Sequence, residues 1–337
     1  MAATSELPFL VADIGGTNAR FALAAIDAEH RPVLSAIREL RAADYPTLGE
    51  AARHYLTLAG SAVEEAVFAV ASPVTGDQIK ITNNPWAFSV QALRAELGLR
   101  ALRLINDFAA IGYAVPHLGA NDVQAIGFMP ERLARDRSDG HYSVLGPGTG
   151  LGVGRLLLRG GEAIIIETEG GHVGFAPCNA YELKILEALL RKFQRVSAER
   201  LLSGPGLLNL YHAVAAVEGV GAEAETPAQI TEQANAAPDS LAGRTVSLFC
   251  ELLGCFTGDT VLAHGAWDGV YLAGGISQKL VAWLERGAFR ARFEQKGRFE
   301  PLLQRVPTLA ITHPHVGLLG SGACALGLHE RHAAARG

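Results

Sequence analysis

A glycine-rich turn that joins one apolar strand directly to another restricts the fold more than any other feature of this chain. Residues 10–26 read LVADIGGTNARFALAAI: an apolar strand, a Gly-Gly-Thr-Asn turn and a second strand in which Phe21, Leu23 and Ala25 alternate. A Walker A loop or a Rossmann turn leads into a helix instead, and directs the amides of that helix at phosphate. No Gly-Lys-Ser or Gly-Lys-Thr occurs in the sequence. The turn therefore predicts a β-hairpin and disfavours both of these nucleotide-binding folds.

A second glycine-rich turn, GPGTGLG at 146–152, lies between strands predicted at 142–145 and 153–158. Its glycines recur every second residue, which does not match G-x-G-x-x-G. Glycines in a hairpin let backbone N–H groups approach phosphate oxygens, and the threonines of the two turns, Thr17 and Thr149, add donors. A single such turn is more simply a tight hairpin. Two of them, in equivalent positions of two half-chains, predict a polyphosphate site and duplicated halves around a central cleft.

Asp13 ends the first predicted strand, immediately before the first glycine turn. A carboxylate in this position is repelled by phosphate unless a divalent cation lies between them, directly or through water. Asp13 is therefore a candidate ligand for Mg²⁺. The alternative is that it accepts hydrogen bonds from the amides of its own turn.

Asn106 and Asp107 follow a short apolar strand at 102–105 and precede a helix at 108–115. Sheets of α/β proteins present ligand-contacting groups at the carboxyl ends of their strands. A kinase that phosphorylates an alcohol needs a carboxylate beside that hydroxyl to orient it and to accept its proton. Asp107 is the candidate for this role, and the alternative is an aspartate that only caps the helix.

Glu169 and His172 lie in the turn Glu-Gly-Gly-His that follows a strand predicted at 163–168. The turn supplies an acceptor and a donor–acceptor on small, bent backbone, which suits paired hydrogen bonds to a polyhydroxylated ligand. The alternative for His172 is a structural histidine, and the spacing of further ligands for a metal is absent. Sugar recognition is the function that this turn favours.

The remaining pattern is mixed, with helices dominating the second half of the chain. A strand at 269–273 ends in Gly274-Gly275, which opens another helix. The other predicted strands are at 66–71 and 78–82, and the other predicted helices are at 48–58, 89–97, 181–193, 205–217, 227–234 and 241–262.

Composition excludes several classes of function. A net charge of −5, with the 29 Lys and Arg scattered, argues against a nucleic-acid partner. Met1 to Pro8 has no basic segment and Asp13 interrupts the apolar stretch after it, so neither a signal peptide nor a membrane span is expected. The four cysteines lack the spacing of a zinc site and are expected to be reduced and mostly buried. The pattern predicts a soluble, cytoplasmic protein.

Taken together and in order, the motifs resemble those of the bacterial glucokinases, within the superfamily of actin-like ATPases, hexokinases and the Hsp70 ATPase domain. The resemblance runs nearly end to end. It rests on these segments: DIGGTNARFAL and GPGTGLGVG as the two phosphate loops, LINDFAAIGYAV as the catalytic segment, ETEGGHVGFAP as the sugar turn, LAGGIS as the adenosine loop, and VSAERLLSGPGLLNLY and GLLGSGACAL as further family segments.

The resemblance implies a role for each candidate residue. Asp107 would be the general base. Glu199 joins the site only through the resemblance, because the residues around it alone would indicate an ordinary charge on a helix surface. The sugar would be held by Asn106, Asp107, Glu169, His172 and Glu199; ATP by Asp13, Gly15, Gly16, Thr17, Asn18, Gly148, Thr149, Gly150, Gly274 and Gly275; Mg²⁺ by Asp13. Segment 72–76 and Asn83 resemble loops that line the sugar cleft.

The resemblance also implies a two-domain α/β actin-like ATPase (ribonuclease H-like) fold with an interdomain cleft. The smaller domain would comprise residues 1–117 plus 313–337, and the larger one 118–312. The expected reaction is transfer of a phosphoryl group from Mg·ATP to the 6-hydroxyl of glucose. Fructose or mannose as the acceptor, a catalytically silent sugar sensor and an assembly-forming actin relative remain alternatives. No nucleic acid or membrane partner is expected, and a homodimer is one option for the assembly.

Overall fold

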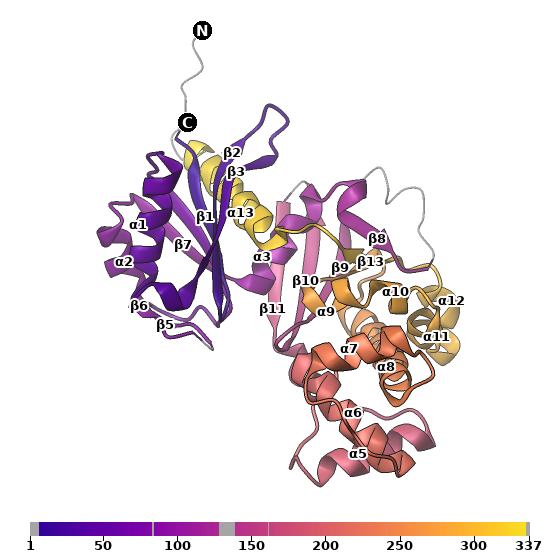
Figure 1. Cartoon of the computed structure of the whole chain (residues 1–337). Coiled ribbons are helices and arrows are strands. Elements are labelled where there is room, and N and C mark those ends of the chain that lie inside the picture. The colour runs from indigo at the N-terminus through magenta and orange to yellow at the C-terminus, as the bar shows by residue number, and fades with distance from the viewer. Residues whose placement is uncertain (1–6, 83, 128–138, 161, 335–337) are drawn as a thin grey trace. The chain divides into compact units, whose positions relative to one another are not determined.

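The computed structural model describes residues 7–82, 84–127, 139–160 and 162–334. By contacts within the chain it divides into two compact units, which are described in turn. Unit 1 comprises 1–119 and 313–337, and unit 2 comprises 120–312. Figure 1 shows the C-terminal helix α13 (Val316–Ala334) among the N-terminal strands, which explains why the first unit takes segments from both ends of the chain.

Unit 1 is built on a mixed sheet with the strand order β3-β2-β1-β4-β7. The first three strands are antiparallel neighbours, whereas β1, β4 and β7 run parallel. The strands are β1 (Phe9–Ile14), β2 (Asn18–Ile26), β3 (Pro32–Arg41), β4 (Glu65–Val70) and β7 (Ala101–Asn106), with a separate pair β5 (Gln78–Lys80) and β6 (Ala87–Ser89).

The two faces of this sheet are covered by different helices (Figure 1). Leu10, Ala12 and Ile14 of β1 belong to a core that includes residues of α1 (Leu48–Ala59) and α2 (Val90–Glu96). Val11, one residue out of phase, packs with Leu318 of α13 on the opposite face. Because side chains alternate along a strand, Asp13 shares the face of Val11 and therefore points toward α13.

Unit 2 repeats this arrangement in its own sheet, with the order β11-β10-β9-β12-β13-β8. Strands β9, β10 and β11 form antiparallel pairs, and β9, β12 and β13 run parallel. The strands are β8 (Val123–Ala125), β9 (Gly140–Pro147), β10 (Leu151–Arg159), β11 (Glu162–Thr168), β12 (Gly269–Leu272) and β13 (Thr308–Ile311). A hairpin with a third antiparallel strand, followed by parallel strands, therefore occurs in both units.

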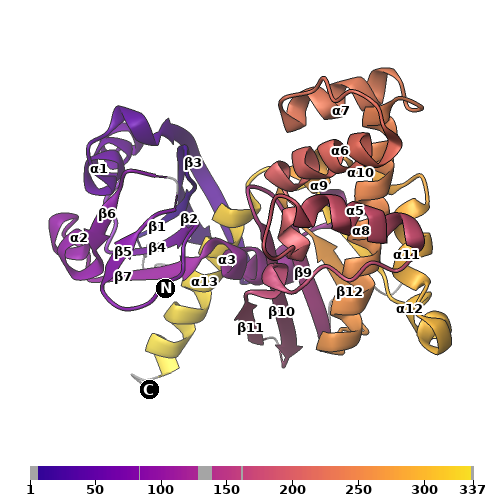
Figure 2. The same cartoon turned by 90° about the horizontal axis from the view of Figure 1, so that it is seen from below.

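The core of unit 2 lies between its sheet and a set of helices (Figure 2). Helix α8 (Leu241–His264) is the centre of this set and contacts α6, α7 and α11. By length and composition it is the one helix in the described part of the chain that could span a membrane, but 67% of its apolar window is buried inside the structure, as in a core helix. The other helices are α5 (Ala180–Leu190), α6 (Gly204–Glu218), α7 (Pro227–Ala236), α9 (Gly274–Lys279), α10 (Val281–Leu284), α11 (Ala288–Glu294) and α12 (Glu300–Leu303).

Candidate active site

The candidate residues of unit 1 gather at one edge of its sheet. Ile14, Val70 and Asn106 are aligned neighbours on β1, β4 and β7, and each is the last residue of its strand. Parallel strands thus place their carboxyl ends side by side. The first glycine turn, which follows Ile14, and Asp107, which follows Asn106, therefore share this edge.

The first glycine turn is a hairpin closed by its own backbone. Gly15 N–H donates to the carbonyl of Asn18 at 2.9 Å, and Gly16 and Thr17 lie at the tip between them. The side chain of Asn84, which the sequence reasoning did not single out, donates to the Gly15 carbonyl at 3.0 Å. The Asn18 amide donates to Glu39 on β3 at 2.7 Å. Neighbouring strands therefore fix the turn, and the Thr17 side chain is exposed.

Asp13 lies on the α13 face at the end of β1, near Arg20 at 3.6 Å. Gly317 of α13 packs directly over it, since a Cβ at that position would lie 2.8 Å from Oδ2 of the carboxylate. Burial raises the pKa of Asp13 above its ordinary value, although Arg20 opposes the shift. A partly buried carboxylate oxygen is the type of ligand that Mg²⁺ takes, and Mg²⁺ commonly uses one or two carboxylates together with substrate phosphates.

Asn106 and Asp107 occupy the junction between β7 and α3 (Asp107–Ala114). The cap of this helix is Asn106, whose Oδ1 accepts from Phe108 N–H at 2.8 Å. Its Nδ2 donates to the Ser72 carbonyl at 3.3 Å, which links the junction to the end of β4. Asp107 is the first helical residue, and its Oδ1 also accepts from Phe108 N–H, at 2.9 Å. The alternative that Asp107 caps the helix is therefore wrong, because Asn106 occupies the N-cap position and Asp107 is the first helical residue.

The second glycine turn joins β9 to β10 in unit 2. Gly148 N–H donates to the Gly150 carbonyl at 2.8 Å, and the Gly148 carbonyl accepts from Gly204 N–H, also at 2.8 Å. Gly204 begins α6, so the first turn of a helix braces this hairpin. Thr149 at the tip is exposed, as Thr17 is in the other turn.

Glu199 connects this turn to the predicted sugar residues. Its Oε2 accepts from Leu151 N–H at 2.9 Å, at the first residue of β10. Its Oε1 lies 3.9 Å from Nδ1 of His172, and the other ring nitrogen of His172 lies 3.8 Å from Glu169. The three side chains thus form one cluster. Glu199 is 28% exposed, against 56% for His172 and 80% for Glu169, so Glu199 is the anchored member.

Gly274 and Gly275 lie at the end of β12, beside the same turn. Gly274 has φ +84°, and a Cβ there would lie 2.6 Å from the Pro147 carbonyl. Only glycine adopts this conformation at this distance from backbone without strain. Gly275 is exposed in the first turn of α9. Unit 2 therefore brings together both of its predicted nucleotide loops.

The last candidates are segment 72–76 and Asn83, which the family resemblance places along the sugar cleft. Ser72 is a buried residue whose hydroxyl oxygen accepts from Thr82 N–H at 2.8 Å, which fixes segment 72–76 to the following loop. Asn83 lies outside the described residues. Asn84, Gly204 and Gly317 were missed. Their signal is weak in the sequence, because Asn84 contacts a backbone carbonyl 69 residues away, Gly204 acts through its own N–H, and Gly317 acts through the lack of a side chain.

Solved structures identify the architecture. One similar crystal structure is that of a glucokinase from an Antarctic psychrotroph, whose sequence is 37% identical to this chain. The two structures match with a TM-score of 0.85 over 96% of this chain and 99% of that chain. A ROK family glucokinase from Streptomyces griseus, in complex with glucose and AMPPNP, has a TM-score of 0.61 at 18% identity, over 94% of this chain and 98% of that chain. The predicted α/β actin-like ATPase (ribonuclease H-like) fold is confirmed.

Sequence comparisons narrow this class further. The family model described as Glucokinase matches residues 10–328. The glucokinase of Xanthomonas euvesicatoria is 48% identical over 325 residues, which are 96% of this chain and 97% of that protein. The chain therefore belongs to the glucokinase family, and the predicted class of activity, phosphorylation of a hexose by a kinase, is confirmed.

Proposed function

We propose that this protein transfers the γ-phosphoryl group of ATP to the 6-hydroxyl of glucose, with Asp107 as the general base. One observation carries the proposal: in a chain of the glucokinase family, Asp107 shares a sheet edge with the first glycine turn. A base and a phosphate-binding turn at one edge are what phosphoryl transfer to an alcohol requires.

Asp107 would orient the sugar hydroxyl and accept its proton as the oxygen attacks phosphorus. The hydrogen bond from Phe108 N–H to Oδ1 holds the carboxylate in place at the start of α3. Asn106, fixed by Phe108 and Ser72, would position the strand end and contact the sugar.

Glu169, His172 and Glu199 would accept and donate hydrogen bonds to the other sugar hydroxyls. Their clustering in unit 2 supports a shared ligand, since two carboxylates beside one imidazole provide several acceptors and one switchable donor. Glu199 would also couple sugar binding to the second phosphate turn through Leu151.

The polyphosphate of ATP would lie against the backbone of both glycine turns, contacting Gly15, Gly16, Thr17 and Asn18 in one and Gly148, Thr149 and Gly150 in the other. Gly274 and Gly275 would contact the adenosine. Mg²⁺, when bound, would stabilise charge on the transferring phosphoryl group, and Asp13 is the residue that would hold it. The absence of any cluster of three potential ligands among the described residues suits a cation shared with phosphate.

The decisive experiment is a panel of phosphoryl donors against sugar acceptors with the purified protein. ATP, ADP and polyphosphate are each combined with glucose, fructose and mannose, and product formation is measured. The proposal expects the highest kcat/KM for ATP with glucose. A clear preference for fructose or mannose would show that this sugar, and not glucose, is the acceptor, and an absence of turnover with every pair would overturn the proposal.

We also propose that units 1 and 2 correspond to the two predicted domains, 1–117 plus 313–337 and 118–312. The protein would act in the cytoplasm, where thiols are kept mostly reduced and disulfides are transient. Sedimentation across a range of protein concentrations would determine whether it forms the homodimer that the resemblance allows.

A further inference from the structure

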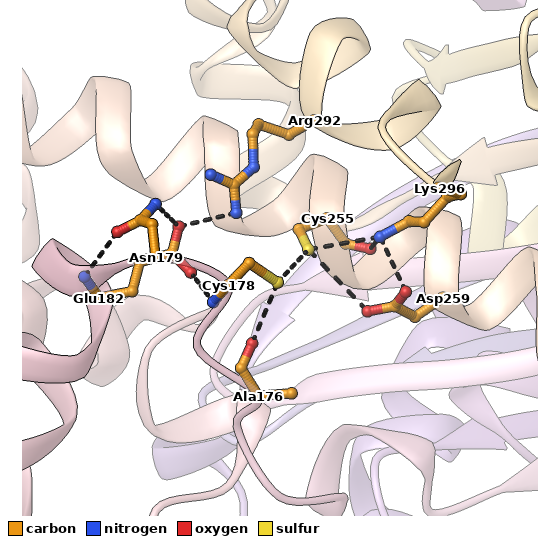
Figure 3. Close-up of polar contacts among 8 residues, drawn as sticks. All are labelled: Ala176, Cys178, Asn179, Glu182, Cys255, Asp259, Arg292 and Lys296. Carbon is orange, nitrogen blue, oxygen red and sulfur yellow. Dashed lines mark hydrogen bonds and ion pairs between the residues drawn. The ribbon is translucent and has the colours of Figure 1, made fainter. Parts of the chain in front are cut away.

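Two cysteines from distant parts of the sequence face each other in unit 2 (Figure 3). The Sγ atoms of Cys178 and Cys255 lie 3.6 Å apart. Cys178 is exposed, in the loop between the sugar turn and α5, whereas Cys255 is buried on α8. No role in the proposed reaction involves either thiol.

The loop that carries Cys178 is held in place by a buried carboxylate. Glu182, 1% exposed, accepts from the backbone N–H of Cys178 at 2.6 Å and pairs with Arg292 of α11 at 2.7 Å. Asn179 caps α5 by accepting from Glu182 N–H at 2.9 Å. These contacts fix the backbone on either side of Cys178, so its thiol has a defined direction toward α8 (Figure 3).

Cys255 has the surroundings of a reactive thiol. The ammonium group of Lys296 lies 3.4 Å from its sulfur, and Oδ2 of Asp259 lies 3.9 Å away. Lys296 can approach because Gly258 has no side chain; a Cβ there would lie 2.6 Å from Lys296 Cε. Lys296 also pairs with Asp259 at 2.8 Å, which fixes both groups beside the sulfur. A cation in contact with a sulfur favours negative charge on it.

A cavity of about 310 Å³ gives small molecules a route to this thiol. Its lining includes Cys255, Asp259 and His264 of α8, together with Gly170 and Phe175 from the segment that follows Glu169. A small peroxide that entered this cavity would meet Cys255, and the cavity also borders the proposed sugar turn at Gly170.

We propose that Cys255 and Cys178 form a reversible disulfide that is made by hydroperoxides and that weakens sugar binding. The Cys255 thiol loses its proton as its sulfur attacks the peroxide oxygen; an S–O bond forms, the O–O bond breaks, and the departing hydroxide takes up that proton and leaves as water. The Cys178 sulfur then attacks Cys255, the S–S bond forms, and the S–O bond breaks, releasing a second water with the Cys178 proton. Two thiols lose two electrons, and hydrogen peroxide gains them.

The assignment of Cys255 as the attacking thiol agrees with the state of its partner. Partial burial, the neighbouring Cys255 sulfur and Glu182 raise the pKa of Cys178 above its ordinary value. A thiol of this kind attacks peroxide slowly and serves better as the second, resolving group.

Disulfide formation would act on the sugar turn through the backbone. The two sulfurs must approach from 3.6 Å to about 2.0 Å. The segment leading to Cys178 is bound to the segment before Glu199: Phe175 N–H donates to the Val196 carbonyl at 3.0 Å, and Ala198 N–H donates to the Val173 carbonyl at 2.9 Å. A pull on Cys178 is therefore transmitted to both His172 and Glu199. This second step rests on the proposed function, whereas the disulfide itself does not.

The test uses the full-length protein, reduced and then treated with hydrogen peroxide in small excess. The number of titratable thiols should fall from four to two, and peptide mass spectrometry should find the Cys178–Cys255 link. The glucose KM should rise about three- to tenfold, because small displacements of binding groups are costly, while the ATP KM stays nearly constant. A dithiol reductant should reverse both changes.

Two variants separate this disulfide from general oxidation damage. Cys178→Ser should keep its glucose KM after peroxide treatment and should trap a sulfenic acid at Cys255, detected with a dimedone-type reagent. Cys250→Ala, at a buried cysteine on the same helix, should behave like the parent protein.

The proposed site would be overturned if peroxide oxidised other cysteines first, or if the Cys178–Cys255 disulfide formed only in urea. A disulfide that forms while the glucose KM stays constant would overturn its effect on sugar binding. Because thiol titration and mass spectrometry need no substrate, they report on the site even where no kinase activity on glucose is found.

Discussion

The two units each carry a glycine hairpin, but the surroundings of the two hairpins differ. Each places a glycine hairpin at the end of a sheet with equivalent strand order, β3-β2-β1-β4-β7 in one and β11-β10-β9-β12-β13 in the other. The unit 1 hairpin is surrounded by charged side chains, among them Asp13, Arg20 and Glu39. The unit 2 hairpin is held by Gly204 N–H, which donates to Gly148, and by one carboxylate, Glu199, which accepts from Leu151 N–H. In the proposed function, unit 1 supplies the base and the metal ligand, and unit 2 supplies most of the groups that position the sugar.

The strongest test of this division is Asp107→Asn in unit 1. The amide keeps the size of the side chain but cannot accept a proton, so kcat should fall by about 10²- to 10⁴-fold. Glucose binding, measured by calorimetry, should change little. Turnover near that of the parent protein would remove the base from unit 1 and with it the proposed contrast.

The second test compares two glutamates within unit 2. Glu169→Ala should raise the glucose KM by about 10- to 100-fold, the equivalent of one lost hydrogen bond to a charged group, and leave the ATP KM within about twofold. Glu199→Ala should raise both constants, because Glu199 also accepts from Leu151 at the phosphate turn. Steady-state kinetics with each substrate varied in turn would measure this. Equal effects of the two variants on ATP would contradict the separate anchoring of Glu199.

A third pair of variants compares a glycine beside the unit 2 hairpin with a glycine in the unit 1 hairpin. Gly274→Ala forces a side chain onto a backbone with φ +84° and toward the Pro147 carbonyl, which should cost about 1–3 kcal/mol of stability and raise the ATP KM. Gly15→Ala meets only the Asn18 carbonyl, at 3.6 Å, and should stay within about 1 kcal/mol. Urea unfolding of both variants would show the difference, and a Gly15→Ala variant as unstable as Gly274→Ala would contradict it.

Local pattern predicted most of the elements around these hairpins. The helix predicted at 89–97 with Ser89 as its cap is α2, and the helix predicted at 241–262 is α8. Strand β3 was missed because most of its residues are exposed, so no alternation of apolar and polar residues marks it. Strand β13 was missed for the opposite reason, since all four of its residues are buried.

The candidate site was less accessible to local reasoning. Glu199 follows no strand and carries no motif of its own; it enters the cluster because a 3₁₀ turn at Ala198–Arg200 brings it to Leu151, 48 residues away. Family resemblance found it, whereas composition did not. Asn84 donates to the carbonyl of Gly15, 69 residues away in the sequence. Gly317 packs over Asp13, about 300 residues away. Contacts of this range depend on the folded sheet, which short patterns do not encode.

The smallest expected effect concerns the charge on Asp13, and it tests whether unit 1 holds this carboxylate at a cost. Burial raises the pKa of Asp13 above its ordinary value of 3.8, so the folded state binds a proton more tightly than the unfolded state. Stability from this group is therefore complete below that value and is lost as the pH rises through the folded pKa. Asp13→Asn does not titrate, and it should raise Tm at neutral pH by no more than about 3 °C, with the gain vanishing below pH 3.8. Thermal unfolding between acidic and neutral pH would measure this.

Asp27→Asn is the control, because Asp27 accepts hydrogen bonds from two backbone N–H groups, at 2.9 and 2.8 Å, and its replacement should not raise Tm. A lower Tm for Asp13→Asn at neutral pH would mean that Arg20 outweighs burial, and that the charge of unit 1 stabilises its hairpin.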